Sequence, residues 1–279
     1  MKKITRRSFM AAAGLTVAAL ALTACGGSSS TASSAAASSV ASSAAASSEA
    51  ASAAATELTT VEAGKLTMAT NAAFPPYEMT TDAGEFEGID IETAQAIADK
   101  LGLELQIDDM DFDAALLSVQ QGKADIVMAG VTVTDERKAV MDFSDSYATG
   151  IQSIIVPEGS DIASPDDLAG KKIGTQRGTT GYIYCSDDFG DENVVAYDDG
   201  LTAVQALNNG QVDAVVIDNA PAKEFVAANP GLVILDTSYA EEDYAIGMAK
   251  GSSLEDAVNA ALEELKADGT LQSIVDKYI

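Results

Sequence analysis

The feature that most constrains how this chain can fold is an internal repeat. Residues 115–130 read ALLSVQQGKADIVMAG, and residues 203–218 read AVQALNNGQVDAVVID. Each copy predicts a helix that ends at a polar pair and a glycine, followed by an aspartate and a short apolar strand. Chance similarity between generic strand and helix units is the alternative. As a true repeat, the pattern predicts two similar α/β lobes rather than one large sheet.

Strand-like and helix-like segments alternate around both copies. In the first half we expect strands at 66–70, 103–107 and 125–129, a helix at 90–101, and a helix from Asp111 or Asp113 to Gly122. The second half repeats this order at 172–175, 193–197, 201–209 and 213–217. Short connections between such elements indicate an α/β fold with open, mixed or parallel sheets and helices on both faces.

The C-terminal part predicts how the two lobes are joined. Residues 243–249 look like a strand, and 254–266 form an amphipathic helix that has no strand partner left in the second lobe. The chain is therefore expected to return to the first lobe. Two crossings, near 153–156 and 244–247, would form a two-strand hinge that allows closure around a ligand. The expected lobes are 61–152 with 247–279, and 153–246.

The N-terminus predicts export and anchoring. Residues 1–24 combine a basic start with an uncharged apolar stretch too short to span a membrane, which is typical of a signal peptide. Residues 22–25 (LTAC) resemble the bacterial lipobox, in which Cys25 would be diacylated. An ordinary signal with a chance cysteine is the alternative. Residues 5–10 also resemble a twin-arginine signal, so the export route stays open.

A Ser- and Ala-rich segment, 26–60, follows Cys25 and is interpreted as a linker. Without residues 1–24 the chain would carry 12 basic and 43 acidic residues, a formal net charge of −31. An anionic lipid surface would repel such a chain, so we expect the lipid on Cys25 to hold it at the outer face of the cell membrane.

Composition excludes several classes of function. The 279 residues include no histidine, which removes Ser-His-Asp catalysis and His-ligated zinc. The acidic balance argues against a nucleic-acid partner. We expect no metal and no cofactor, a monomer, and a free, non-catalytic thiol at Cys185, because no histidine can activate it.

Five motifs carry a family resemblance. They lie at 69–78 (ATNAAFPPYE), 88–91 (GIDI), 110–112 (MDF), 129–137 (AGVTVTDER) and 142–147 (DFSDSY). In this order and spacing they resemble extracellular solute-binding proteins, family 3, of polar amino-acid ABC transporters, over about residues 61–279. The resemblance implies a type II periplasmic-binding-protein fold. It also implies a polar amino acid bound in the cleft between the lobes, and an ABC permease as partner.

The resemblance also implies which residues recognise the zwitterion. Arg137 would bind the α-carboxylate, because a carboxylate needs a fixed positive fork. The backbone of Gly130 and the hydroxyl of Thr132 would contact the same group. Asp218 would take the α-ammonium. The alternatives are a surface arginine in a charge run, and an aspartate that only caps a helix ahead of Pro221.

Further site residues follow from the same resemblance. Phe74 and Phe112 would be aromatic walls, while Tyr77 is expected to pack under the loop. In the loop after the second lobe's first strand, Thr179 or Thr180 would donate a backbone amide to the carboxylate. Gln176 stands there where the family often has lysine, which leaves that loop's charge role open.

Side-chain selectivity stays open. Asn71 stands where many binders of basic amino acids have an acid, and a neutral amide there fits a ligand such as glutamine. Gln152 could bond either a neutral or a basic side chain. A basic amino acid and cystine therefore remain candidates.

Two other function classes are weighed. An enzyme similar to cyclohexadienyl dehydratases would need a general acid in the cleft, and the sequence indicates no cleft acid beyond Asp218. A ligand-sensing lipoprotein is the second. We expect a binding protein and not an enzyme.

Overall fold

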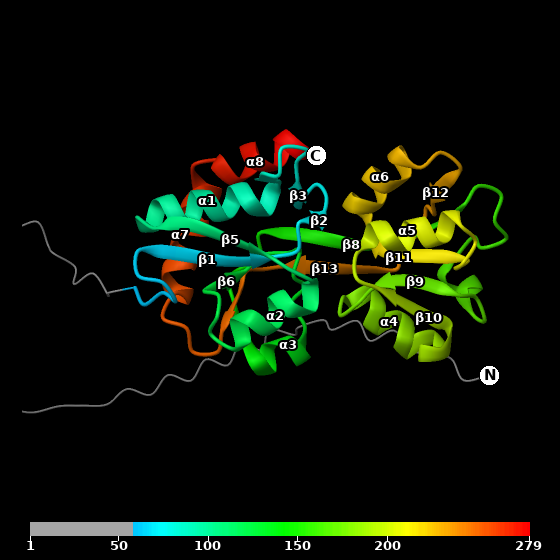
Figure 1. Cartoon of the computed structure of the whole chain (residues 1–279), viewed down its shortest axis with the longest axis horizontal. Coiled ribbons are helices and arrows are strands. Elements are labelled where there is room, and N and C mark those ends of the chain that lie inside the picture. The colour runs from blue at the N-terminus through cyan, green and yellow to red at the C-terminus, as the bar shows by residue number, and fades with distance from the viewer. Residues whose placement is uncertain (1–57) are drawn as a thin grey trace, which may run out of the picture. The chain divides into compact units, whose positions relative to one another are not determined.

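The computed structural model describes residues 58–279, which form two α/β lobes (Figure 1). The expected signal peptide, Cys25 and most of the expected linker lie outside the described residues. Residues 58–60 are described, and Leu58 is partly buried against the hydrophobic core. The packed part of the chain therefore begins no later than Leu58.

The first lobe is built on a five-stranded mixed sheet. Its order is β5 (Glu104–Asp109), β1 (Lys65–Thr70), β6 (Ile126–Val127), β14 (Gly247–Ala249) and β7 (Met141–Phe143). β1 runs parallel to β5 and β6, whereas β14 runs antiparallel to β6 and β7. Side chains alternate in β1, so that Leu66 and Met68 join one core cluster and Ala69 joins another on the opposite face.

Helices cover both faces of this sheet. α1 (Ile89–Leu101), α7 (Glu255–Ala267) and α8 (Thr270–Tyr278) pack against one another, while α2 (Phe112–Gln120) packs on β1 and β14, and α3 (Asp135–Val140) contacts β7. α1 ends at Gly102, whose φ of 70° is the left-handed conformation that glycine favours. The amphipathic helix predicted at 254–266 is α7, and its apolar face is buried. A small sheet of β2 (Ala73–Phe74), β3 (Glu78–Thr80) and β4 (Phe86–Glu87) adjoins the lobe.

The second lobe repeats this plan. Its sheet has the order β10 (Val194–Tyr197), β9 (Ile173–Gln176), β11 (Ala214–Asp218), β8 (Ala148–Pro157) and β12 (Leu232–Ile234), and β13 (Ala240–Tyr244) also pairs with β8. α4 (Thr180–Phe189) packs on one face, and α5 (Gly200–Asn208) and α6 (Asn219–Ala228) pack on the other. Two short 3₁₀ helices, Pro165–Leu168 and Asp191–Asn193, complete the lobe.

The sheet topology confirms the fold class. The parallel strands β5-β1-β6 and β10-β9-β11 have the same order, and the repeated sequence occupies α2 with β6 in one lobe and α5 with β11 in the other. An antiparallel strand follows the parallel ones in each sheet, so both sheets are mixed.

The crossings between the lobes differ from the prediction at one place. All of β8 lies in the second sheet, so the expected crossing near 153–156 is wrong. The chain crosses instead at residues 144–147, because β8 already pairs with β13 of the second sheet from Ala148 onward. The second crossing lies between β13 and β14, at Ala245 and Ile246. Ser144 N donates to Ile246 O (2.9 Å), and Tyr147 N donates to Tyr244 O (3.0 Å), so the two crossings form one hydrogen-bonded hinge.

Candidate functional site

A cavity lies between the lobes, where β6 and β11 end, and its roughly 420 Å³ of empty space includes part that is open to solvent. All ten residues expected to bind the ligand line it: Asn71, Phe74, Phe112, Gly130, Thr132, Arg137, Gln176, Thr179, Thr180 and Asp218. The carboxyl ends of parallel strands are where open α/β sheets bind ligands. The geometry thus brings the predicted residues of both lobes to one site.

Arg137 is the cationic group of this site. It lies in α3, whose N-cap Thr134 accepts a hydrogen bond from Arg137 N, and its side chain is only 8% exposed. Nη1 donates to Thr132 O (2.8 Å) and Nη2 to Gly178 O of the second lobe (3.1 Å). The guanidinium lies 5.3 Å from the centre of the Phe112 ring. With five N–H donors and two in use, Arg137 keeps three for a carboxylate.

Asp218 is the anionic group from the opposite lobe, at the end of β11. Its Oδ1 accepts from Ala220 N and so caps α6, which is the alternative structural role expected from the sequence. Oδ2 accepts from Ile151 N (2.8 Å) and from the Tyr244 hydroxyl (2.6 Å). Burial raises the pKa of Asp218 to about 6, although these hydrogen bonds oppose the shift. The carboxylate both caps the helix and lines the cavity.

Gly130 and Thr132 differ in detail from the expectation. Gly130 N donates to Asp90 Oδ2 (3.0 Å), and the Thr132 hydroxyl donates to Glu242 (3.2 Å). Neither group is therefore free to donate to a ligand carboxylate as expected. Thr132 pairs with Tyr244 in an antiparallel bridge, whose hydrogen bonds are donated by Val133 N and Ala245 N. The Thr132 N–H takes no part in this bridge and can donate to a ligand.

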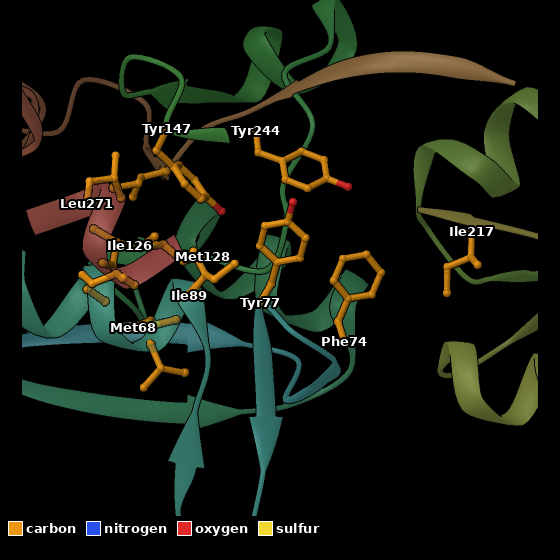
Figure 2. Packing of buried hydrophobic residues seen from close by; sticks show 14 of the residues in the cluster. Met68, Phe74, Tyr77, Ile89, Ile126, Met128, Tyr147, Ile217, Tyr244 and Leu271 are labelled. Carbon is orange, nitrogen blue, oxygen red and sulfur yellow. The ribbon is translucent and has the colours of Figure 1, made fainter. Parts of the chain in front are cut away.

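The aromatic wall depends on two close approaches to glycine. Gly130 has φ 54°, and a Cβ there would lie 2.9 Å from Phe74 Cε1. A Cβ on Gly150 would lie 2.4 Å from Tyr244 Cζ and 2.6 Å from Asp218 Oδ2. Figure 2 shows Phe74, Tyr77 and Tyr244 together, with Ile217 of the second lobe apart from them. Tyr77 is 3% exposed and packs against the Phe74 and Tyr244 rings, as expected.

Asn71 and Gln176 join the lobes at another wall of the cavity. Asn71 Nδ2 donates to Met110 O (2.9 Å), and Gln176 Nε2 donates to Asn71 Oδ1 (2.8 Å) and Asp198 O (3.3 Å). Backbone carbonyls accept only, so they fix the orientation of both amides. Within the described part of the chain, Gln176 Oε1 and one Asn71 N–H are then left without a hydrogen-bond partner.

The start of α4 supplies backbone donors. Thr179 is its N-cap and accepts from Tyr182 N, while Thr179 N points back to Gln176 O (3.4 Å). Thr180 is the first helical residue, whose N–H has no partner within the helix. Between the two candidate amides, this geometry leaves Thr180 N–H as the free donor.

Sequence reasoning missed several residues around the cavity. Glu78, Ala129, Ile217 and Tyr244 line it, as does Gln152, which had been weighed only as a selectivity residue. Glu242 lies behind Thr132 and Thr180 and accepts from both hydroxyls. Because Glu78 lines the cavity, the expectation of no cleft acid beyond Asp218 is wrong. Strand alternation could have found Glu242, because it shares a face of β13 with the buried Tyr244.

Glu78 and Asp90 form a pair of buried acids next to the cavity. Both side chains are fully buried. Burial first, and then the charge of Asp90, raise the pKa of Glu78 well above its usual value, and burial raises that of Asp90 to about 6. Asp90 also accepts from the Tyr147 hydroxyl (2.8 Å) in the hinge. A protonated Glu78 can donate to Asp90, which makes the pair a structural support beneath Gly130.

The fold and the cavity between similar lobes define a two-lobed binding protein of the type II periplasmic class. Residues 66–279 match the family model of bacterial extracellular solute-binding proteins, family 3, and the chain belongs to this family. Among the described residues, no helix is both long and apolar enough to cross a membrane.

Several known proteins are similar to this chain. It is 33% identical to the L-cystine-binding protein TcyJ of Escherichia coli K12, over 78% of this chain and 83% of TcyJ. A probable histidine-binding protein of Neisseria gonorrhoeae is 32% identical over 96% of this chain and 94% of its own. A solved ancestral arginine-binding protein bound to arginine is 43% identical, with a TM-score of 0.74, covering 77% of this chain and 98% of its own.

Proposed function

We propose that this protein binds a free polar α-amino acid between its lobes and delivers it to the membrane subunits of an ABC transporter. The observation that carries the proposal is the pair Arg137 and Asp218, which come from different lobes and line one cavity. A guanidinium and a carboxylate on opposite sides complement the two charged groups of a zwitterion. The relatives that bind cystine, histidine and arginine support the same ligand class.

The proposed binding mode places each end of the zwitterion. The α-carboxylate would accept from the free N–H groups of Arg137, the N–H of Thr132 and the N–H of Thr180 at the start of α4. The α-ammonium would donate to Asp218, to the Gly130 carbonyl and to the Thr132 hydroxyl oxygen. Phe74 and Phe112 would flank the ligand's side chain.

The ligand's side chain would reach the amides of Asn71 and Gln176. Their fixed orientation leaves the Gln176 Oε1 acceptor, which favours a side chain with N–H groups. A thermal-shift and calorimetric screen against the twenty amino acids and cystine tests the proposal, because a ligand that binds the folded state raises apparent stability with its concentration. We expect stabilisation by arginine, glutamine or histidine. If no amino acid stabilises the protein, the proposal fails.

The anchor is part of the same proposal. A lipid on Cys25 and a flexible tether would hold this extracellular binding protein, as a monomer, near its permease. Replacing Cys25 with alanine should release the protein from the membrane with its affinity unchanged. We place the lobe boundaries in the crossing segments 144–147 and 245–246, in place of the expected 152/153 and 246/247. A protein starting at residue 58 should bind the ligand.

An enzyme remains the weaker candidate. Glu78 is an acid in the cavity wall with a raised pKa, as a general acid would need. However, the neighbouring Asp90 and its own complete burial fit a structural proton-sharing pair better. Turnover of prephenate or arogenate would favour the enzyme, and we expect none.

A further inference from the structure

Glu242 accepts hydrogen bonds from three residues that line the cavity, although it is not itself part of the lining. It lies in β13 and is 6% exposed. Its Oε2 accepts from Gln152 Nε2 (2.9 Å), Thr180 Oγ1 (2.9 Å) and Thr132 Oγ1 (3.2 Å). Thr132 belongs to the first lobe and Thr180 to the second, so one carboxylate oxygen connects both walls through a hinge strand.

The two hydroxyls become acceptors because of this carboxylate. A threonine hydroxyl has one proton and two lone pairs, and a carboxylate only accepts. When both protons point at Glu242, only oxygen lone pairs remain for the cavity that both threonines line. The 3.4 Å between the two hydroxyl oxygens is long for an O–H···O bond, so neither hydroxyl needs to donate to the other.

We infer that Glu242 is a positioning residue that fixes the hydroxyls of Thr132 and Thr180 as acceptors, and thereby makes this part of the cavity select a ligand ammonium. The inference rests on the proposed function and deepens it. An ammonium has donors only and fits these lone pairs, whereas an uncharged oxygen substituent at the same carbon fits them less well.

The charges around Glu242 agree with this role. Burial lowers the pKa of Arg137, and the charge of Glu242 is the largest effect that opposes this shift. Glu242 therefore helps to keep the guanidinium charged without binding it directly. A ligand carboxylate is drawn to Arg137, while the lone pairs in front of Glu242 repel it, so the amino acid has one favoured orientation.

The test compares an amino acid with its 2-hydroxy acid. The probes are whichever of L-arginine, L-histidine and L-glutamine binds the wild-type protein most tightly, and the 2-hydroxy acid with the same side chain. Calorimetry gives the ratio of the two affinities for the wild type, Glu242→Leu and Glu242→Gln. The matched control is Glu241→Gln, which removes a negative charge from an exposed neighbour in the same strand.

The expected results distinguish a positioning role of Glu242 from a merely structural role. Glu242→Leu should weaken amino-acid binding by about thirtyfold and hydroxy-acid binding by about threefold, so the ratio falls by about tenfold. The released hydroxyls can then donate to the hydroxy acid. Glu242→Gln keeps an acceptor oxygen and should keep the ratio within about threefold, as should Glu241→Gln.

Several outcomes would overturn the inference. An unchanged ratio in Glu242→Leu means a merely structural role, and an equal fall in Glu242→Gln or Glu241→Gln means that charge alone matters. If Glu242→Leu does not fold, Thr132→Val replaces it in the test. This variant should lower the ratio by a similar factor, and an unchanged ratio would overturn the inference. If the wild type binds no amino acid, the proposed function fails together with the inference.

Discussion

The two lobes share one strand order but present opposite charges to the cavity. In the first lobe the chain passes from β6 through a turn into the short helix α3, which carries Arg137. In the second lobe β11 ends directly in Asp218, which caps α6. The repeated frame therefore brings two strand ends together, and the residue that ends β11 and the helix that follows β6 decide the charge. The difference between the copies is what makes a site for a zwitterion.

The strongest way to break this comparison is to remove the cation. Arg137→Ala should weaken amino-acid binding by about 3–5 kcal/mol, a factor of about 100 to 1,000 or more, because a buried carboxylate loses its partner. Arg137→Lys keeps a charge but not the planar fork and should fall in between. Calorimetry measures both. Binding within fivefold of the wild type in Arg137→Ala would place the site elsewhere.

Removing the anion should have a slightly smaller effect. Asp218→Asn keeps the size and one acceptor oxygen for the helix cap, but loses the charge opposite the ammonium. We expect a loss of about 2–3 kcal/mol in binding, which is about 30- to 150-fold. Asp218→Ala should in addition unfold more easily by about 1 kcal/mol, because α6 loses its cap. Equal thermal stability of the two variants would refute the capping role.

The approach of Tyr244 to Asp218 offers a steric test. Gly150→Ala would push a methyl group against both side chains, and such overpacking costs about 1–3 kcal/mol. We expect amino-acid affinity to fall about tenfold in a calorimetric titration. Thr149→Ala, at the exposed neighbouring position of β8, is the control and should leave affinity unchanged. Identical affinities in the two variants would mean that the Tyr244 contact does not shape the site.

The comparison also predicts a pH dependence that comes from one lobe. The pKa of Asp218 is raised to about 6, so the carboxylate is protonated as the pH falls below that value. Amino-acid affinity should then fall by up to about tenfold per pH unit, because a neutral acid cannot pair with the ammonium. Asp218→Asn should flatten this profile between pH 5 and pH 7, and an unchanged profile would assign it to another group.

The raised pKa of Asp218 gives the stability of the ligand-free protein the opposite pH dependence. The folded-state pKa of Asp218 lies above its ordinary value of 3.8. Its contribution to the free energy of unfolding is therefore fully present at low pH and is lost as the pH rises through about 6. Ligand affinity and this part of the stability should change in opposite directions over the same range.

The smallest effect is expected away from the cavity, in the core of the second lobe. Cys185 is fully buried on the α4 side of the sheet, and burial raises its pKa to about 12. Cys185→Ser should leave amino-acid affinity within about threefold while lowering thermal stability, because a hydroxyl enters an apolar cluster. A hundredfold loss of affinity would show that the site extends into this core.

Local patterns predicted much of this fold and site. Alternation and helical periodicity located most helices and strands, and the family resemblance assigned Asn71, Gly130 and Asp218 to one cleft, where all three line the cavity. The first crossing was misplaced because residues 148–157 form one continuous strand of the second sheet, and nothing local in the sequence marks where that strand begins. Glu242 was missed because it lies between the exposed Glu241 and Asp243, and an acidic run usually faces solvent. Strand alternation would have grouped it with the buried Tyr244, but its contacts with both lobes depend on the tertiary fold, which local spacing does not contain.

The position of β14 sets an order of assembly during synthesis. This strand lies between β6 and β7 in the first sheet, yet it comes from residues 247–249. The first lobe begins earlier in the chain but cannot close its sheet until the second lobe has been made. The strands of the second sheet lie in one continuous stretch, from Ala148 to Tyr244, and need no later residue. The later lobe can therefore be finished first, and the earlier lobe must wait with its strand edges unpaired.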